Sequence, residues 1–242
     1  MIINYKNQPK IKTIDFDFLK NTSVSFLHLS DLHIGIIKDN HFYEKIIDNI
    51  YEFLTHNKVD FIILNGDIFD SSCYLDLIYK FLFSFNELDI DIYYVFGNHE
   101  ENDVLLFEKI INKNYLKNIK ILKNSNIVVG NLNLIGLFKE KEYIDISNLL
   151  INNKRNIIVS HNPISYKYLE KEVSNIFILS GHTHGEQLRF IGRHKLLDKS
   201  KLSGFYKLNN NNILYISSGA GYGKIPIRFL TESVIEYFKH TL

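Results

Sequence analysis

The chain of 242 residues has one cysteine and three prolines, and it has no long linker rich in proline, glycine or serine. The single cysteine, Cys73, excludes an internal disulfide and any metal cage built from thiolates, and it suits a reducing compartment. Because no linker interrupts the alternation of strand-like and helix-like patterns, we predict one domain over residues 1–242. A hydrophobic content of 45% is enough to form a substantial core.

The chain also lacks an excess of charge of either sign. It has 28 Lys and Arg and 27 Asp and Glu, which give a formal net charge of +1. The chain therefore has no global field for nucleic acid, and no specific nucleic-acid partner is expected. No run approaches the roughly 18 to 20 apolar residues of a membrane span. Residues Met1 to Lys12 are polar where a signal peptide is apolar. The sequence thus predicts a soluble, cytoplasmic protein without a transmembrane segment, while peripheral membrane contact stays open.

The sequence does contain five short apolar runs, and each run is followed by a cluster of Asp, His or Asn. Each cluster stands where a buried strand is expected to end. In layered α/β folds, ligands bind outside the carboxyl ends of the strands, so clusters far apart in sequence converge on one site. The other histidines, such as His28, are expected to be structural or on the surface. The clusters are Asp31-Leu32-His33, Gly66-Asp67, Gly97-Asn98-His99-Glu100, His161 and Gly181-His182-Thr183-His184.

Amphipathic segments follow the first three clusters, at 42–56, 74–88 and 104–114, and are predicted to be helices that cross between parallel strands. A leading strand is expected at 13–18. Both halves of the chain fit an α/β fold, a four-layer α/β/β/α sandwich of two mixed β-sheets flanked by helices. Shorter strands are predicted in the second half, at 126–129, 132–137, 205–208, 213–217, 225–230 and 234–238.

The residue types of the clusters suit metal binding. One residue separates Asp31 from His33, and one separates His182 from His184. In an extended segment this spacing places both side chains of a pair on the same face. Asp67 adds a carboxylate directly after a glycine, where the backbone can approach an ion closely. Each element alone is unspecific, because an isolated Asp-x-His in a loop is far more common than a metal site.

The ordered combination of clusters resembles the calcineurin-like metallophosphoesterase superfamily, whose pattern is Asp-x-His, Gly-Asp-x-x-Asp, Gly-Asn-His-Glu/Asp, His and Gly-His-x-His. The resemblance extends from Asp31 to His184. The chain departs at Glu186 from the narrower YkuE-like branch of bacterial proteins, which usually has a second glycine there. Three segments carry the likeness to this branch, namely Ser180 to Gln187, Ser203 to Tyr206 and Ile225 to Phe229.

The resemblance implies a centre of two metal ions held by seven side chains. Oxygen and imidazole ligands without thiolate suit Mn, Fe or Zn, and the family favours Mn with Fe. By this likeness the first ion is held by Asp31, His33 and His184, the second by Asn98, His161 and His182, and both by the bridging carboxylate of Asp67.

The resemblance further implies a hydrolase, above all a phosphodiesterase or pyrophosphatase. A hydroxide that bridges the metals would attack phosphorus in line, and His99 would assist the leaving oxygen while Asp70 orients its imidazole. Two divalent ions would outweigh the negative charges of Asp31, Asp67 and the hydroxide, and so attract a phosphate. Asp70 has a second interpretation as the cap of the following helix, and Glu100 is interpreted as a turn or helix-start residue.

The substrate is less clearly indicated. Residues 185–204 carry five basic and two acidic side chains, and Arg189 and Arg193 there, with Arg228, are candidates to bind a second phosphate. An ordinary solvated loop explains the same composition equally well. The YkuE-like resemblance suggests a lipid-linked diphosphate of the cell envelope or a small phosphate ester.

Other functions of the same fold stay open at this point, namely a phosphomonoesterase, a protein phosphatase, or a catalytically silent metal-binding scaffold. A scaffold has no need for His99 or for the complete ligand set, so the completeness of the set favours an enzyme.

Overall fold

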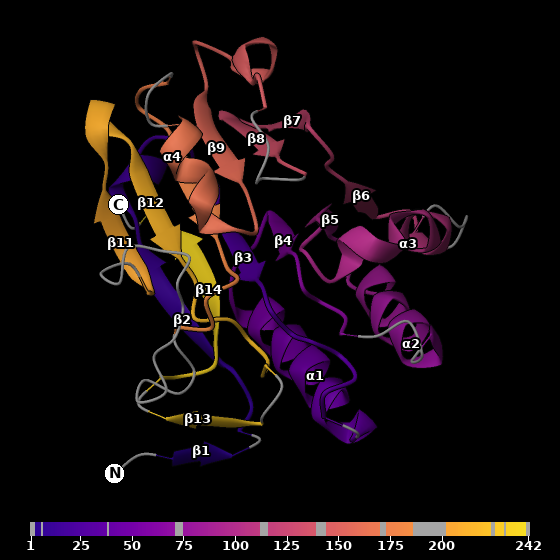
Figure 1. The fold of residues 1–242 in the computed structure, drawn as a ribbon. Helices are drawn as coiled ribbons and strands as arrows, with labels where there is room; N and C mark the ends of the chain where they lie inside the picture. Colours follow the sequence, from indigo (N-terminus) through magenta and orange to yellow (C-terminus); the bar gives the residue numbers. More distant parts are fainter. Residues whose placement is uncertain are drawn as a thin grey trace.

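The computed structural model describes residues 3–5, 7–37, 39–70, 75–111, 116–138, 144–169, 173–185, 202–223, 226–229 and 231–240. Two six-stranded mixed β-sheets pack face to face, and helices lie on their outer faces (Figure 1). The predicted α/β class, with two mixed sheets flanked by helices, is confirmed. The single domain over residues 1–242 stays a prediction. None of the helices in the described ranges has both the length and the apolar character needed to cross a bilayer.

The first sheet consists, in spatial order, of β2 (Lys10–Asp15), β14 (Val234–Lys239), β3 (Phe26–Leu29), β4 (Phe61–Asn65), β5 (Asp91–Val95) and β6 (Ile119–Ile121). Strands β3 to β6 are parallel, as expected for strands joined by helical crossovers. Strand β14 is antiparallel to β3 and parallel to β2. A strand from the end of the described chain therefore lies between two strands from its beginning.

The second sheet consists, in spatial order, of β11 (Gly204–Lys207), β12 (Ile213–Ile216), β10 (Phe177–Ser180), β9 (Arg155–Val159), β8 (Leu132–Gly136) and β7 (Ser125–Val129). The four central strands are parallel, and each edge strand is antiparallel to its neighbour. The hairpin of β7 and β8 turns at Gly130, whose φ of 55° is easily adopted by glycine.

Four helices and one small sheet complete the described structure. A separate pair of antiparallel strands is formed by β1 (Ile3–Tyr5) and β13 (Ile227–Phe229). The helices are α1 (Asn40–His56), α2 (Leu75–Asn86), α3 (Val104–Ile111) and α4 (Tyr166–Leu169). Short 3₁₀ turns occur at Asp17–Leu19, Glu100–Asp103, Ser147–Leu149, Pro163–Ser165 and Asn209–Asn211.

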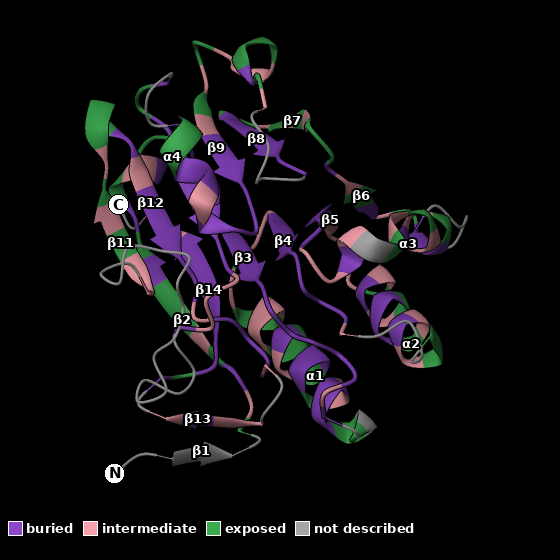
Figure 2. Cartoon of the chain, viewed as in Figure 1, coloured by how far each residue is buried: buried purple, intermediate pink, exposed green. Residues whose placement is uncertain are grey.

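Three apolar layers hold the sheets and helices together, because successive side chains of a strand point to opposite faces. In the first sheet, Leu27 and Ile62 pack toward α1 and α2, whereas Phe26 and Phe61 pack into the space between the two sheets. The outer face of the second sheet packs against α4. Figure 2 shows the consequence, with buried strands in the centre and exposed residues on the outer surfaces of the helices.

The leading strand and two short strands differ most from the prediction. The leading strand was expected at 13–18, but β2 ends at Asp15 and a 3₁₀ turn follows at Asp17–Leu19. Strands β1 and β6 were not predicted, because each has only three residues and so shows no measurable alternation.

One polar network lies within the apolar space between the sheets. His28 and Glu236 are both 0% exposed, and His28 Nδ1 lies 2.9 Å from Glu236 Oε2. Tyr215, in β12, and Ser217, in the loop that follows β12, donate to Glu236 Oε1 at 3.2 and 2.7 Å. Asn65 Nδ2 lies 3.1 Å from His28 Nε2. The buried carboxylate is therefore fully partnered and links the two sheets.

We predict that Glu236→Ala lowers the free energy of unfolding by about 3 to 5 kcal/mol, because it leaves the buried His28, Ser217 and Tyr215 without their acceptor. Glu232→Ala is the matched control, since Glu232 pairs with Lys10 on the surface. This variant should lose much less free energy of unfolding. Urea unfolding measures both variants, and equal losses would contradict the role of the network.

Candidate metal centre

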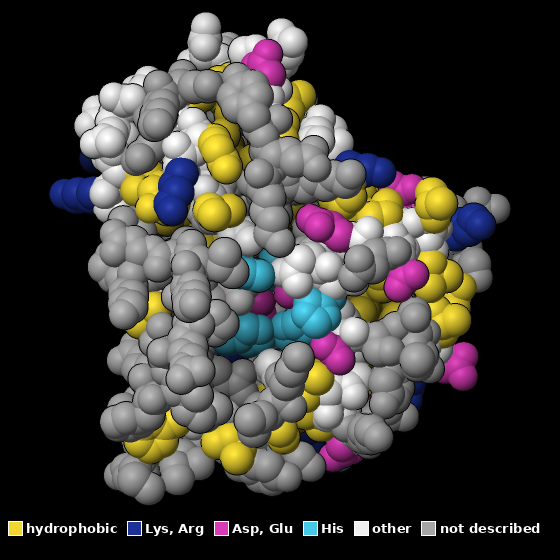
Figure 3. Space-filling model, in the orientation of Figure 1, with side chains coloured by type: hydrophobic (Ala, Val, Ile, Leu, Met, Phe, Trp, Pro, Cys, Tyr) yellow, Lys and Arg dark blue, Asp and Glu magenta, His cyan; other side chains and the backbone are white. Residues whose placement is uncertain are grey.

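The five polar clusters meet at one place, at the carboxyl ends of strands from both sheets. Contacts join the clusters: Asp67 lies within 4.0 Å of His99 and His161, and Asp31 lies within 3.9 Å of His161 and His184. Figure 3 shows histidine side chains gathered in a hollow of the surface, with acidic side chains beside them. Asp31 and His33 follow β3, Asp67 follows β4, Asn98 and His99 follow β5, His161 follows β9, and His182 and His184 follow β10.

The backbone turns sharply at these clusters. Five of the predicted ligands adopt the left-handed conformation, with φ of 54° at Asp31, 44° at His33, 49° at Asp67, 70° at His182 and 51° at His184. This conformation is uncommon for residues other than glycine, although Asp and His adopt it more readily than most. Unusual backbone conformations concentrate at functional sites, where the surrounding structure holds them.

Two glycines let the clusters approach one another. A Cβ atom on Gly97 would lie 2.3 Å from Asp67 Oδ1, and one on Gly181 would lie 2.5 Å from Asp31 Oδ2. Such distances are shorter than any real Cβ contact, so side chains at these two positions would displace both carboxylates. The glycines of the sequence motifs therefore serve close packing of the site.

Asp31, His33 and His184 form the first cluster, with one ligand atom from each residue within 4.8 Å of the others. His33 Nε2 lies 3.0 Å from His184 Nε2, which lies 3.5 Å from Asp31 Oδ1. The carboxylate of Asp31 is fully buried and accepts the backbone N–H of His182 at 3.0 and 3.1 Å. The carboxylate is thus held in a fixed position from the side of β10.

Asp67, His161 and His182 form the second cluster by the same distance criterion. His161 Nε2 lies 3.1 Å from Asp67 Oδ2, and its Nδ1 lies 2.8 Å from the carbonyl oxygen of Asn65. A proton on Nδ1 is held by that carbonyl, so the lone pair of Nε2 faces the cluster. Asp67 Oδ2 also lies 3.9 Å from His33 Nε2 in the first cluster. One carboxylate oxygen therefore faces imidazoles of both clusters.

The residues present fit metal ions. Two ligand atoms that each lie about 2.1 Å from one ion, at angles of about 90° to 110°, are about 3.0 to 3.4 Å apart. The spacings His33–His184, His184–Asp31 and His161–Asp67, of 3.0, 3.5 and 3.1 Å, are close to this range. Asn98 offers a further oxygen, because its Oδ1 is buried and accepts no hydrogen bond from the described residues. A buried amide oxygen without a donor is costly, and a cation would satisfy it.

The ionisation of the ligands also suits a cation. Burial would raise the pKa of Asp31 and of Asp67, but nearby histidines, His184 and His161 foremost, hold both below their ordinary values. Burial lowers the pKa of His184 to about 3, so its imidazole is neutral at physiological pH. The pKa of His33 is raised, because its carboxylate neighbours outweigh burial. Three of these four groups already have the protonation state of a metal ligand.

His99 and Asp70 lie at the exposed rim of the site, with 33% and 28% of their side chains accessible. Asp70 Oδ1 lies 3.3 Å from His99 Nδ1 and 3.6 Å from His33 Nδ1, so one carboxylate faces two imidazoles. The two histidines hold the pKa of Asp70 below its ordinary value, with the contact to His33 as the largest cause. Helix α2 begins at Leu75, and the residues between lie outside the described ranges.

The three arginines expected to bind substrate are placed differently. Arg189 and Arg193 lie outside the described residues, so their role stays a prediction. Arg228 is 0% exposed, and its guanidinium donates to backbone carbonyls. The expectation that Arg228 faces substrate does not agree with this position, because a fully buried guanidinium with backbone partners cannot reach a ligand in the hollow.

Glu100, which the sequence indicated only as a turn or helix-start residue, is a central part of the site. Its carboxylate is 0% exposed, and burial together with Asp67 raises its pKa above the ordinary value. It joins the loops that follow β4 and β5. Its oxygens accept the backbone N–H groups of Asp67 (2.9 Å), Ile68 (2.8 Å), Phe69 (3.2 Å) and Gly97 (2.9 Å), and the hydroxyl of Tyr94 (3.0 Å).

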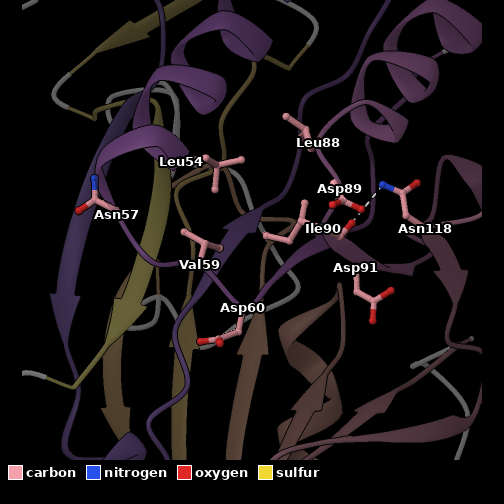
Figure 4. Close-up of a pocket in the computed structure, with 9 residues that line it drawn as sticks. All are labelled: Leu54, Asn57, Val59, Asp60, Leu88, Asp89, Ile90, Asp91 and Asn118. Atoms are coloured by element: carbon pink, nitrogen blue, oxygen red, sulfur yellow. Dashed lines mark hydrogen bonds between the residues drawn. The ribbon is translucent and has the colours of Figure 1, made fainter.

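A second hollow lies at the opposite, amino ends of β4 and β5 (Figure 4). Two of its three acidic side chains have other partners: Asp60 accepts from Ser25, and Asp91 pairs with Lys120 at 3.0 Å. Asn118 donates there to the carbonyl of Ile90. No group of potential metal ligands is found there among the described residues. This hollow is therefore separate from the metal centre and does not share its chemistry.

We predict that Glu100→Ala lowers the free energy of unfolding of the metal-free protein by at least about 3 kcal/mol. The change leaves four buried backbone N–H groups without an acceptor, and each such group costs about 1 to 3 kcal/mol. Glu101→Ala is the control, because Glu101 is the next residue and is only half-buried. Urea unfolding with a chelator present measures both, and a loss similar to that of the control would contradict the role of Glu100.

Comparison with known proteins agrees with this geometry. The family model of the calcineurin-like phosphoesterase domain matches residues 24–186, more than half of the chain and the whole range of the polar clusters. An uncharacterized metallophosphoesterase of Helicobacter pylori (strain ATCC 700392 / 26695) is 32% identical over 246 residues, which cover 96% of this chain and 64% of that protein. The chain thus spans 64% of the length of this relative.

Two relatives from Bacillus subtilis (strain 168) are similar over most of the chain. The uncharacterized metallophosphoesterase YkoQ is 25% identical and covers 90% of this chain and 86% of its own length. The uncharacterized metallophosphoesterase YkuE is 23% identical and covers 92% of this chain and 79% of its own length. The resemblance indicated by the ordered motifs is confirmed, and this chain belongs to the calcineurin-like metallophosphoesterases, a family of metal-dependent phosphoric ester hydrolases.

Proposed function

We propose that this protein is a phosphodiesterase or pyrophosphatase that holds two metal ions. In this proposal the first cluster, Asp31, His33 and His184, holds one ion, and Asn98 joins His161 and His182 at the other. Asp67 bridges the two. Mn with Fe is the proposed pair, with Zn as an alternative, because the ligands are oxygen and imidazole without thiolate. A cytoplasmic location stays a prediction from composition.

The observation that carries the proposal is the position of the Asp67 carboxylate between the two clusters. Its Oδ2 lies 3.1 Å from His161 Nε2 and 3.9 Å from His33 Nε2, and its Oδ1 accepts the backbone N–H of His99 at 2.9 Å. A carboxylate that faces ligands of two sites from one oxygen is suited to hold two cations close together. Two ions bound in this way supply positive charge that attracts a phosphate, and they lower the pKa of a shared water molecule.

The other residues would orient the reaction. His99 is one-third exposed at the rim, so its imidazole can reach the leaving oxygen of a bound ester. Asp70, 3.3 Å from His99 Nδ1, can accept a hydrogen bond from that nitrogen and so orients the imidazole with Nε2 on the side of Asp67. The same carboxylate faces His33, so it couples the orientation of a ligand to that of the proton donor.

The charges of the described residues favour a diester over a monoester. The ion-pair partners of Asp31, Asp67 and Asp70 among the described residues are all histidines. A monoester carries one more negative charge than a diester at neutral pH, and it needs a further cation to bind it. Arg189 and Arg193 would supply that charge to the second phosphate of a diphosphate, which is the form that a lipid-linked substrate would take.

The test is turnover of bis(4-nitrophenyl) phosphate and of its monoester analogue by metal-stripped protein, before and after addition of Mn. We predict that Mn restores turnover and favours the diester, and that Asp67→Asn abolishes turnover and weakens the binding of both ions. Asp89→Asn is the control, because Asp89 lies beside the hollow at the opposite ends of the strands.

Three results would contradict this proposal. Full metal content and full rate in Asp67→Asn would remove Asp67 from the bridging role. Two bound ions without turnover of either ester would instead favour a metal-binding scaffold or an enzyme that accepts only its own substrate. A preference for the monoester would indicate a phosphomonoesterase or protein phosphatase.

We predict that His99→Ala keeps both metal ions but loses about 10² to 10⁴ in rate on a diester with an alkyl leaving group. The loss should be much smaller with 4-nitrophenolate, which leaves without a proton. His41→Ala is the control, since His41 lies on the surface and pairs with Glu44. Equal losses on both substrates would exclude proton donation by His99, and metal content measured on the same samples separates this effect from loss of the ions.

A further inference from the structure

Arg228, in β13, is a buried cation in an unusual setting. Its side chain is 0% exposed, and burial lowers its pKa to about 10, so it stays charged at neutral pH. None of the ion pairs formed by the described residues includes Arg228. A buried charge destabilises a fold unless neighbouring groups compensate for it, and here the compensating groups belong to the backbone.

The guanidinium donates hydrogen bonds from all three of its nitrogens. A lysine carries its donors on a single atom and could not reach the same set of acceptors, whereas the planar fork of arginine reaches them together. Nε donates to Gly221 (3.1 Å), Nη1 to Ser218 (2.6 Å), Glu232 (3.1 Å) and His184 (3.4 Å), and Nη2 to Gly221 (2.6 Å) and Gly219 (3.1 Å), in every case to the backbone carbonyl oxygen.

Most of these carbonyls belong to the 218–221 turn, which packs against Asp31. The N–H of Gly221 donates to the carbonyl of Asp31 at 3.0 Å, and that of Ala220 donates to the carbonyl of Ser30 at 2.9 Å. A Cβ atom on Gly219 would lie 2.8 Å from the Cβ of Asp31. The turn therefore touches Asp31 on one side and is fixed by Arg228 on the other.

We infer that Arg228 is a positioning residue for the first metal site: its fork fixes the 218–221 turn and the backbone of His184, and thereby places Asp31 and His184. This inference rests on the proposed two-metal function. The contribution comes from the geometry of the fork, because the positive charge of a guanidinium opposes the binding of a cation nearby. Arg228 thus acts through Asp31 and His184 and touches neither metal nor substrate.

The test compares Arg228→Lys, which keeps the charge but loses the fork, with Arg228→Met, which loses both. Binding of Co²⁺ to the metal-stripped protein is followed by its visible absorption and by metal analysis, without any activity assay. His33→Asn and His182→Gln provide reference spectra for loss of the first and of the second ion. Arg155→Met is the control, since Arg155 is exposed and lies over the Phe18 ring.

We predict that the native protein binds two ions, and that both Arg228 variants bind the first ion at least tenfold more weakly and the second unchanged. Their spectra should then match that of His33→Asn. Native affinity in Arg228→Lys would show that charge alone matters and would overturn the inference, as would an equal weakening of both ions. If Arg228→Met binds two ions at native affinity, the inference is overturned but the proposed function is not. If the native protein binds fewer than two ions, the inference and the proposed function are both overturned.

A second variant covers the case in which neither Arg228 variant folds, as judged by circular dichroism and urea unfolding. Gly219→Ala moves the same turn without changing the guanidinium, because the added Cβ would press on Asp31 and because the φ of Gly219 is 79°. This variant should weaken the binding of the first ion alone. Unchanged binding of that ion in a folded Gly219→Ala protein would overturn the inference.

Discussion

The carboxylate of Asp67 is the point on which the site depends, because it faces residues carried by both sheets. Its oxygens reach His161 from the second sheet and His33 and His99 from the first. Asp67 can do this only from a left-handed backbone that places the side chain over the end of the first sheet, with a φ of 49°. The geometry of the metal centre therefore depends both on the packing of the two sheets and on the conformation of the turn after β4.

Two buried polar side chains hold that arrangement through the backbone. Glu100 accepts four N–H groups from the loops after β4 and β5, and Arg228 donates to carbonyls of the 218–221 turn and of His184. Glu100 thereby supports the side of the site that includes Asp67, and Arg228 supports the side that includes Asp31. Backbone groups have fixed positions along the chain, so bonds to them specify loop shape more strictly than bonds between flexible side chains.

The ligands could be predicted from the sequence because each stands at the end of an apolar run in a fixed order, and the α/β class followed from the same alternation. Asp31, His33, Asp67, His161, His182 and His184 come together as that order implies. Glu100 and Arg228 could not be assigned, because their partners are backbone groups whose positions depend on the path of the chain and not on residue type. The place of β14 was equally hidden, since the pairing of strands more than two hundred residues apart leaves no local pattern.

The position of β14 has a consequence for the order of folding. The first sheet has β14 between β2 and β3, with Glu236 on that strand partnered by His28. A ribosome must therefore release residues up to Lys239 before the sheet can close, although Asp31 and His33 are synthesised much earlier. Until then β2 and β3 each have an edge without its neighbour, so a nascent or truncated chain exposes hydrogen-bonding edges on which aggregation can start. Strands β3 to β6 pair with each other without β14, so they can assemble before β14 is synthesised.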